Sequence, residues 1–135
     1  MVGRPIVPPD VEQLLCDHAR TLIADGVLPS GCWVGSDDPP VKKYRWLVRV
    51  VAVNGTRDSF VQMAWDVAFT VIGPDGFGPE TTRAALDLIG HLEQAVDGDP
   101  ITALLDINGP GRIVDEDDRP KRFITATLLA RGSHP

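Results

Sequence analysis

The sequence predicts an α+β fold: an antiparallel (mixed) β-sheet with two α-helices packed on one face, in the order α-β-β-β-α-β-β. Two central segments, YRWLVRVVAV and VQMAWDVAFTVI, have the composition and alternation of long strands. A last segment, KRFITATLLAR, alternates in the same way, and two segments with helical apolar spacing flank the central pair. Helices outside an antiparallel sheet segregate to one of its faces, which gives this architecture.

The chain begins with nine residues, MVGRPIVPP, that show no periodicity. We expect 1–9 to be a flexible arm and 10–135 to form a single domain. A helix is predicted from Val11 to about Asp25, because apolar residues recur there every three or four positions. Asp10 with Gln13 fits a capping box, and Gly26 fits the position just past the helix end.

Three strands are predicted next. A short one, Cys32 to Val34, lies between turn residues, and the two long central strands form a hairpin. The polar link NGTRDSF is longer than a two-residue hairpin loop, so we expect an irregular tip there.

The second helix is predicted from Pro79 to about Val96. A short apolar run to Ile107 follows, then an Asn-Gly-Pro-Gly turn at 108–111, a short strand at 112–114, an acidic link, and a strand from Lys121 to Arg131. Both faces of this last strand are at least half apolar. One face therefore packs under the helices, and the other needs a second cover, for which a neighbouring subunit is a candidate.

Charge and cysteine usage exclude several functions. The net charge is −6, whereas sequence-independent DNA binding depends on Lys and Arg that neutralise phosphates. Cys16 and Cys32 have neither CxxC spacing nor clustered histidines, so we expect buried free thiols and no metal or cofactor. No apolar run has the length of a membrane span, and we expect synthesis in a reducing cytoplasm.

Four segments together resemble the tail terminator proteins of long-tailed (siphovirus-type) bacteriophages. They are PDVEQLLCDHARTLI, VRVVAVNGTRDSFVQMAWDVAFTVIG, ETTRAALDLIGHLEQAV and GPGRIVDEDDRPKRFITATLLAR. These resemble the first helix, central hairpin, second helix and final strand pair of that family. The loops PSGCWVGSDDPP and GPDGFGPE depart from the family pattern.

The resemblance implies a structural virion protein at the head–tail junction and no enzymatic activity. It implies a ring, most simply a homohexamer, that caps the tail tube, stops its polymerisation and offers the head-joining surface. The partners would be further copies of the chain, the tail tube protein and a head-completion protein. DNA would pass through the lumen without specific binding, because a negatively charged wall repels phosphates.

Two groups of residues are candidates for these contacts. The candidates for the subunit or tube interface are Arg57, Asp58, Trp33, Trp46 and Trp65. At least one of the three tryptophans is expected to be exposed in the free subunit. The acidic candidates for the lumen or an axial face are Asp37, Asp38, Asp115, Glu116, Asp117 and Asp118. For any one of them, a solvated outer loop remains the simpler interpretation.

Two other function classes stay open. One is a different connector of the virion neck, a stopper or an adaptor. The other is a small enzyme or ligand-binding domain, for which the available residues are His18, His91, Asp66 and Cys16. No motif in the sequence places a nucleophile beside a base.

Overall fold

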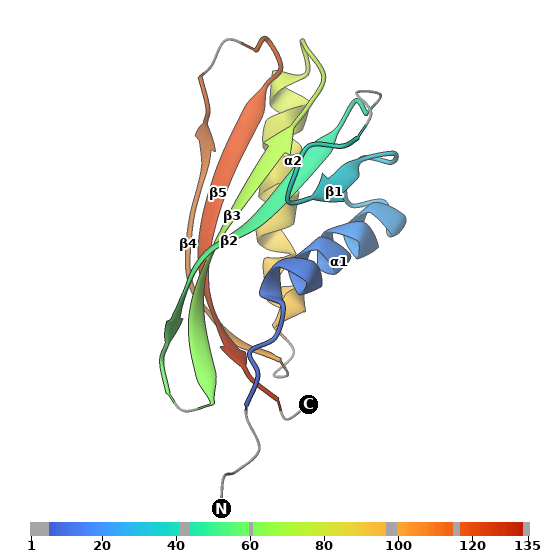
Figure 1. Cartoon of the computed structure of the whole chain (residues 1–135). Coiled ribbons are helices and arrows are strands. Elements are labelled where there is room, and N and C mark those ends of the chain that lie inside the picture. The colour runs from blue at the N-terminus through green and yellow to red at the C-terminus, as the bar shows by residue number, and fades with distance from the viewer. Residues whose placement is uncertain (1–5, 41–43, 60, 97–99, 115–116, 134–135) are drawn as a thin grey trace, which may run out of the picture.

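The computed structural model describes residues 6–40, 44–59, 61–96, 100–114 and 117–133. Five strands form one sheet in the order β1-β2-β3-β5-β4, and both helices lie on the same side of it (Figure 1). The elements are α1 (Val11–Ala24), β1 (Trp33–Gly35), β2 (Leu47–Arg57), β3 (Gln62–Ile72), α2 (Gly78–Gly90), a 3₁₀ helix (Leu92–Ala95), β4 (Ile101–Arg112) and β5 (Lys121–Arg131). Strand β1 runs parallel to β2 and the other pairs are antiparallel. The predicted fold class and element order are confirmed.

Local sequence explains where α1 begins and ends. The Asp10 carboxylate accepts a hydrogen bond from the backbone N–H of Gln13 at 3.0 Å, as the capping box requires. The Gln13 side chain turns away and donates to Asp17. At the other end, Asp25 is the C-cap and Gly26 has φ +78°, a conformation that glycine adopts without steric cost.

The core lies between the helices and one face of the sheet. Alternate residues of β2, β3 and β5 point into it, and the buried apolar ones are Val48, Val50, Val67, Phe69, Val71, Ile124, Ala126, Leu128 and Ala130. From α1 and α2 come Leu15, Ala19, Leu22, Ala85 and Leu88. Burial of these side chains, rather than helix propensity, fixes the position of both helices.

The central hairpin is longer than predicted. Strand β2 continues through Asn54 and Gly55 to Arg57, with a register shift between Ala52 and Asn54. Gly55 pairs with Trp65, and its Cα lies so close to that indole that a Cβ would stand 2.7 Å from the ring. The two strands are instead joined beyond Arg57, where the backbone N–H groups of Asp58 and Ser59 both donate to the Gln62 carbonyl. Gly55 therefore makes room for the Trp65 ring, and no turn forms at the Asn-Gly pair.

Two further boundary predictions were wrong. The second helix ends at Gly90, with His91 as its cap, and the chain continues as a 3₁₀ turn instead of an unbroken helix to Val96. The Asn-Gly-Pro-Gly stretch at 108–111 is no turn. It is an irregular stretch of a single strand β4, with a register shift between Asn108 and Gly111 and φ +115° at Gly109. Strand β4 therefore replaces the apolar run, the turn and the short strand at 112–114 that were predicted.

The part of the predicted arm that the structure describes lies along the end of the sheet. Val7 and Ser133 exchange two backbone hydrogen bonds, of 2.8 and 3.0 Å. Residues 1–5 of the predicted arm lie outside the described residues. No helix within the described part of the chain is both long and apolar enough to cross a membrane.

Candidate functional site: an open sheet face and its terminal pocket

The face of the sheet opposite the helices is largely uncovered. Its central rows contain small or apolar residues, among them Val51, Ala68, Phe123, Thr125 and Leu129. Val51 is 37% exposed and Phe123 is 39% exposed. The predicted alternation on β3 and β5 is confirmed, and the second face does carry the apolar residues that the sequence indicated. We call this surface the open face.

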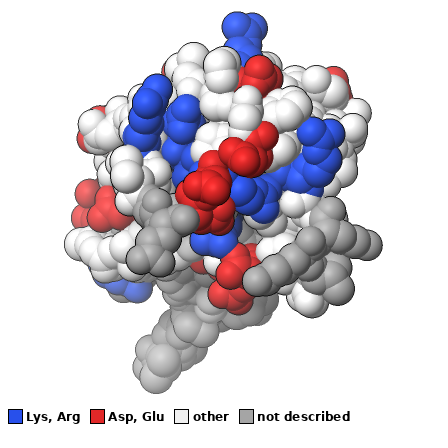
Figure 2. Space-filling model, turned by 90° about the horizontal axis from the view of Figure 1, so that it is seen from above, with Lys and Arg blue, Asp and Glu red and all other residues white. Residues whose placement is uncertain are grey.

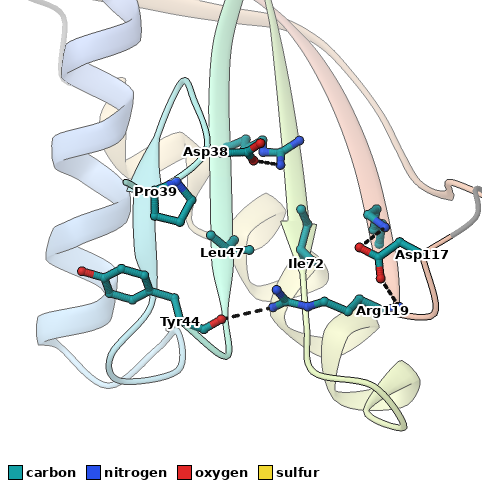
Figure 3. Close-up of a pocket in the computed structure, with 9 residues that line it drawn as sticks. Asp38, Pro39, Tyr44, Leu47, Ile72, Asp117 and Arg119 are labelled. Atoms are coloured by element: carbon teal, nitrogen blue, oxygen red, sulfur yellow. Dashed lines mark hydrogen bonds and ion pairs between the residues drawn. The ribbon is translucent and has the colours of Figure 1, made fainter. Parts of the chain in front are cut away.

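Two loops border one end of the open face. The loop after β1 brings Asp38 and Pro39 beside β2, and the link before β5 places Asp117 beside β5 and Arg119 across the end of β3 (Figure 3). Between them lies a pocket of about 330 Å³. Its lining residues are Asp38, Pro39, Tyr44, Leu47, Arg49, Ile72, Asp117, Arg119 and Lys121. We call it the terminal pocket.

The terminal pocket is apolar at its base and charged around its sides. Leu47 and Ile72 are buried neighbours on β2 and β3. Arg49 pairs with Asp38, and the Lys121 ammonium lies 3.3 Å from a carboxylate oxygen of Asp117. The Lys121 side chain is only 10% exposed, so this cation is held where water screens it poorly.

Arg119 ties three segments together at this end. Its Nε donates to the Gly73 carbonyl at 3.0 Å, and one terminal nitrogen donates to the carbonyls of Arg45 at 2.5 Å and Tyr44 at 3.5 Å. These carbonyls belong to the segment entering β2 and the loop leaving β3. A planar guanidinium suits several acceptors at once, so Arg119 fixes the shape of the pocket wall.

The charges at this end are organised on both sides of the sheet. The backbone N–H of Arg119, and then the ammonium of Lys121, hold the pKa of the exposed Asp117 below its ordinary value. On the helix side, Arg122 donates from Nε to Thr82 Oγ1 at 2.8 Å. Burial, and then the charge of Arg112, lower the pKa of Arg122. Viewed onto this end, basic and acidic side chains lie next to each other (Figure 2).

The structure brings together two of the predicted acidic groups. Asp38 and Asp117 are far apart in sequence but line the same pocket. Each is paired with a cation, so neither is a bare negative charge. Asp37 and Asp118 are exposed, and Asp115 and Glu116 lie outside the described residues. Assignment of this group to a lumen wall stays a prediction.

The interface candidates are distributed over the whole molecule. Arg57 ends β2 and Asp58 begins the turn, so both are at the hairpin tip as predicted, and both are exposed. All three tryptophans are partly buried, and the expectation that one would be exposed was wrong. Trp46 and Trp65 pack against the core, while Trp33 packs against Tyr44 with ring centroids 5.3 Å apart and the ring planes tilted by 47°. Partial burial leaves each tryptophan with a structural role in the isolated subunit.

The residues available to an enzyme do not form a catalytic group. His18 donates from Nε2 to the backbone carbonyl of His91 at 2.9 Å, on the helix side. Asp66 is on the open face, where it accepts a hydrogen bond from Thr127. Cys16 is buried and Cys32 partly buried, both as free thiols. Within the described ranges, no group of three or more His, Cys, Asp or Glu residues is placed to hold a metal ion.

Sequence reasoning did not find the cations of the terminal pocket. Arg49 offered one signal, since it is a charged residue on the outward side of an otherwise apolar strand. Arg119 and Lys121 gave none, because their partners are distant in sequence and include backbone carbonyls.

Comparisons with known proteins find similarity among solved structures but no match of sequence. No protein-family model matches the sequence, and no curated protein matches it. Among solved structures, the chain is similar to a chain of a particle described as the virion of a native gene transfer agent (GTA). The identity is 16%, the match covers 93% of this chain and 94% of that one, and the TM-score is 0.47. A similarity this weak does not assign a function.

Proposed function

We propose that the chain is a structural protein of a phage-type virion, and within it a tail terminator. It forms a ring that caps the tail tube, stops tube polymerisation and offers the surface to which the head binds. The open face carries the proposal, because a sheet face with exposed Val51 and Phe123 gains stability when another protein surface covers it.

The distribution of the sequence resemblance supports the same proposal. Its four segments correspond to α1, the β2–β3 hairpin, α2, and β5 with the last four residues of β4, so they include most of the long elements of the fold. The two loops that depart from the family pattern, 29–40 and 73–80, flank the end that holds the terminal pocket. Contacts specific to this chain's own partners are expected at that end.

Electron microscopy of particles assembled without this gene tests the role. A terminator predicts abnormally long tube polymers beside filled heads that lack tails. Tails of normal length lying unattached would instead indicate a neck adaptor or stopper. Intact infectious particles would contradict a role in tail assembly altogether.

A further inference from the structure

We propose that residues 6–9, which we call the arm segment, are exchanged between neighbouring copies, so that the arm segment of one copy binds the end of β5 of the next. Its binding site is formed by Gly132 and Ser133, and we call it the arm seat. The inference rests on the proposed function, because it assigns one of the contacts that would link copies in the ring. In the single chain, the arm segment occupies the arm seat of its own subunit.

The arm seat is shaped to accept this segment. Val7 and Ser133 each donate a backbone hydrogen bond to the other's carbonyl, at 2.8 and 3.0 Å. Gly132 leaves room for the chain beside it, since a Cβ there would stand 2.5 Å from Ile6 Cγ2 and 3.0 Å from the Val7 carbonyl oxygen. The backbone N–H of Gly132 donates to the Val61 carbonyl at 2.8 Å. The sheet therefore holds the arm seat in place whether or not an arm segment is bound.

The arm segment is attached to its own subunit by few contacts. Within the described residues, the two bonds to Ser133 are the only hydrogen bonds that residues 6–9 make. Val7 is 46% exposed and Pro8 is also exposed, whereas the buried core cluster begins at Val11. A segment with so few buried apolar contacts can detach while the rest of the domain stays folded.

The connection between the arm segment and α1 allows this detachment. Pro8 and Pro9 have no backbone N–H, so they add no donor that would tie the arm segment to the domain. Helix α1 is capped by Asp10, which accepts a hydrogen bond from the Gln13 N–H at 3.0 Å, and this cap does not involve the arm segment. The three residue steps from Val7 to Asp10 span at most about 11 Å. Neighbouring copies must therefore meet at this end of the sheet, the lower end in Figure 1.

A second copy is the partner that fits the arm seat. It carries the identical segment, so an exchanged arm makes the same contacts with its neighbour that it makes within its own chain. Exchange of an identical element between protomers needs no new complementary surface and is a low-cost route to association. In a dilute chain the arm segment stays on its own seat, because its effective concentration there is high. A ring holds a neighbour's seat nearby as well, and each exchanged arm then links two copies.

Cysteine pairs locate the arm segment directly. Two single variants, Val7→Cys and Ser133→Cys, would be mixed, assembled with the tail tube protein and oxidised. Residues in a hydrogen-bonded antiparallel pair have Cα atoms about 5.5 Å apart, which is within the range of a disulfide. Exchange predicts a disulfide between the two different chains, at least roughly tenfold more abundant than in a control mixture of Val7→Cys with Ser30→Cys. Ser30 is an exposed serine in the loop after α1.

A change in the arm seat tests whether this disulfide depends on specific binding. Adding Gly132→Ala to the Ser133→Cys chain places a Cβ in the path of the arm segment and should lower the yield of the disulfide several-fold. Adding Gly90→Ala instead should leave the yield unchanged, because the new Cβ meets no atom within 4 Å. Equal yields from the two chains would overturn the inference.

The double variant Val7→Cys, Ser133→Cys compares the free and assembled states. In dilute solution its disulfide should lie within one chain, and after assembly it should join chains into a ladder on a non-reducing denaturing gel. Capped tubes in which every disulfide stays within one chain would overturn the exchange and leave the terminator role standing. A chain that does not bind tubes would contradict the terminator role. In that case oxidation of the chain alone at about 1 mM, where neighbouring seats compete with the chain's own, tests the exchange, and a yield of interchain disulfide no higher than in the control mixture would overturn it.

Discussion

Gly73 shows how closely the segments pack where β3 leads into α2. A Cβ at this position would lie 2.0 Å from Thr81 Oγ1 and 3.1 Å from the Trp46 ring. Thr81 cannot easily move, because it is fully buried and its hydroxyl donates to the Phe77 carbonyl at 2.7 Å. Steric crowding, rather than a special backbone angle, therefore requires glycine here.

We predict that Gly73→Ala lowers the free energy of unfolding by about 1–3 kcal/mol, the usual cost of overpacking. Urea denaturation monitored by tryptophan fluorescence measures it. Gly90→Ala is the matched control, because no atom lies within 4 Å of its added Cβ, and it should be neutral or slightly stabilising. Equal effects of the two changes would contradict this account of Gly73.

Cys32 is expected to be chemically inert in the folded protein. Burial raises the pKa of its thiol to about 12, so the reactive thiolate is scarce near neutral pH, by roughly a thousandfold relative to an ordinary thiol. Alkylation followed by mass spectrometry should be slow in the native protein and fast in denaturant. In the native state the rate should keep rising with pH beyond 9. Rapid native labelling at pH 8 would contradict the burial of this thiol.

At the scale of elements, Arg119 connects the β4–β5 link to the segments beside β2 and β3. Arg119→Ala leaves the carbonyls of Gly73 and Arg45 without this donor. We predict a loss of about 2 kcal/mol in the free energy of unfolding, as for hydrogen bonds from charged groups. Arg83→Ala, which removes an exposed pair on α2, should cost under about 0.5 kcal/mol. Urea denaturation of both variants measures these losses in the free energy of unfolding. Equal losses would contradict the role of Arg119.

Elements with clear periodicity could be predicted from the sequence, and those governed by distant pairing could not. The strand from Lys121 to Arg131 was predicted with its observed bounds, and α1 within one residue, because alternation and capping are local signals. Two turn-like stretches gave wrong predictions, namely Asn-Gly at 54–55 and Asn-Gly-Pro-Gly at 108–111. Pairing with β3 and β5 overrides their turn preference. The terminal pocket was not predictable, because Asp38 and Asp117 become neighbours only through the fold.

At the scale of the whole molecule, the fold presents three surfaces besides its layer of helices. The helices cover one face of the sheet, the other face is open, and the two ends carry the hairpin tip and the terminal pocket (Figure 1). A ring that caps a tube needs surfaces for its neighbours and for the tube, and also one for the head. The open face, the hairpin tip and the terminal pocket are the candidates for these contacts.

The most direct test of that proposal is the polymerisation of the cognate tail tube protein in the presence of this chain, with tube lengths measured by electron microscopy. A terminator predicts shorter tubes as the chain is added, each with a ring of it at one end, at amounts far below one copy per tube subunit. An unchanged length distribution, or binding along the whole tube, would contradict the proposal.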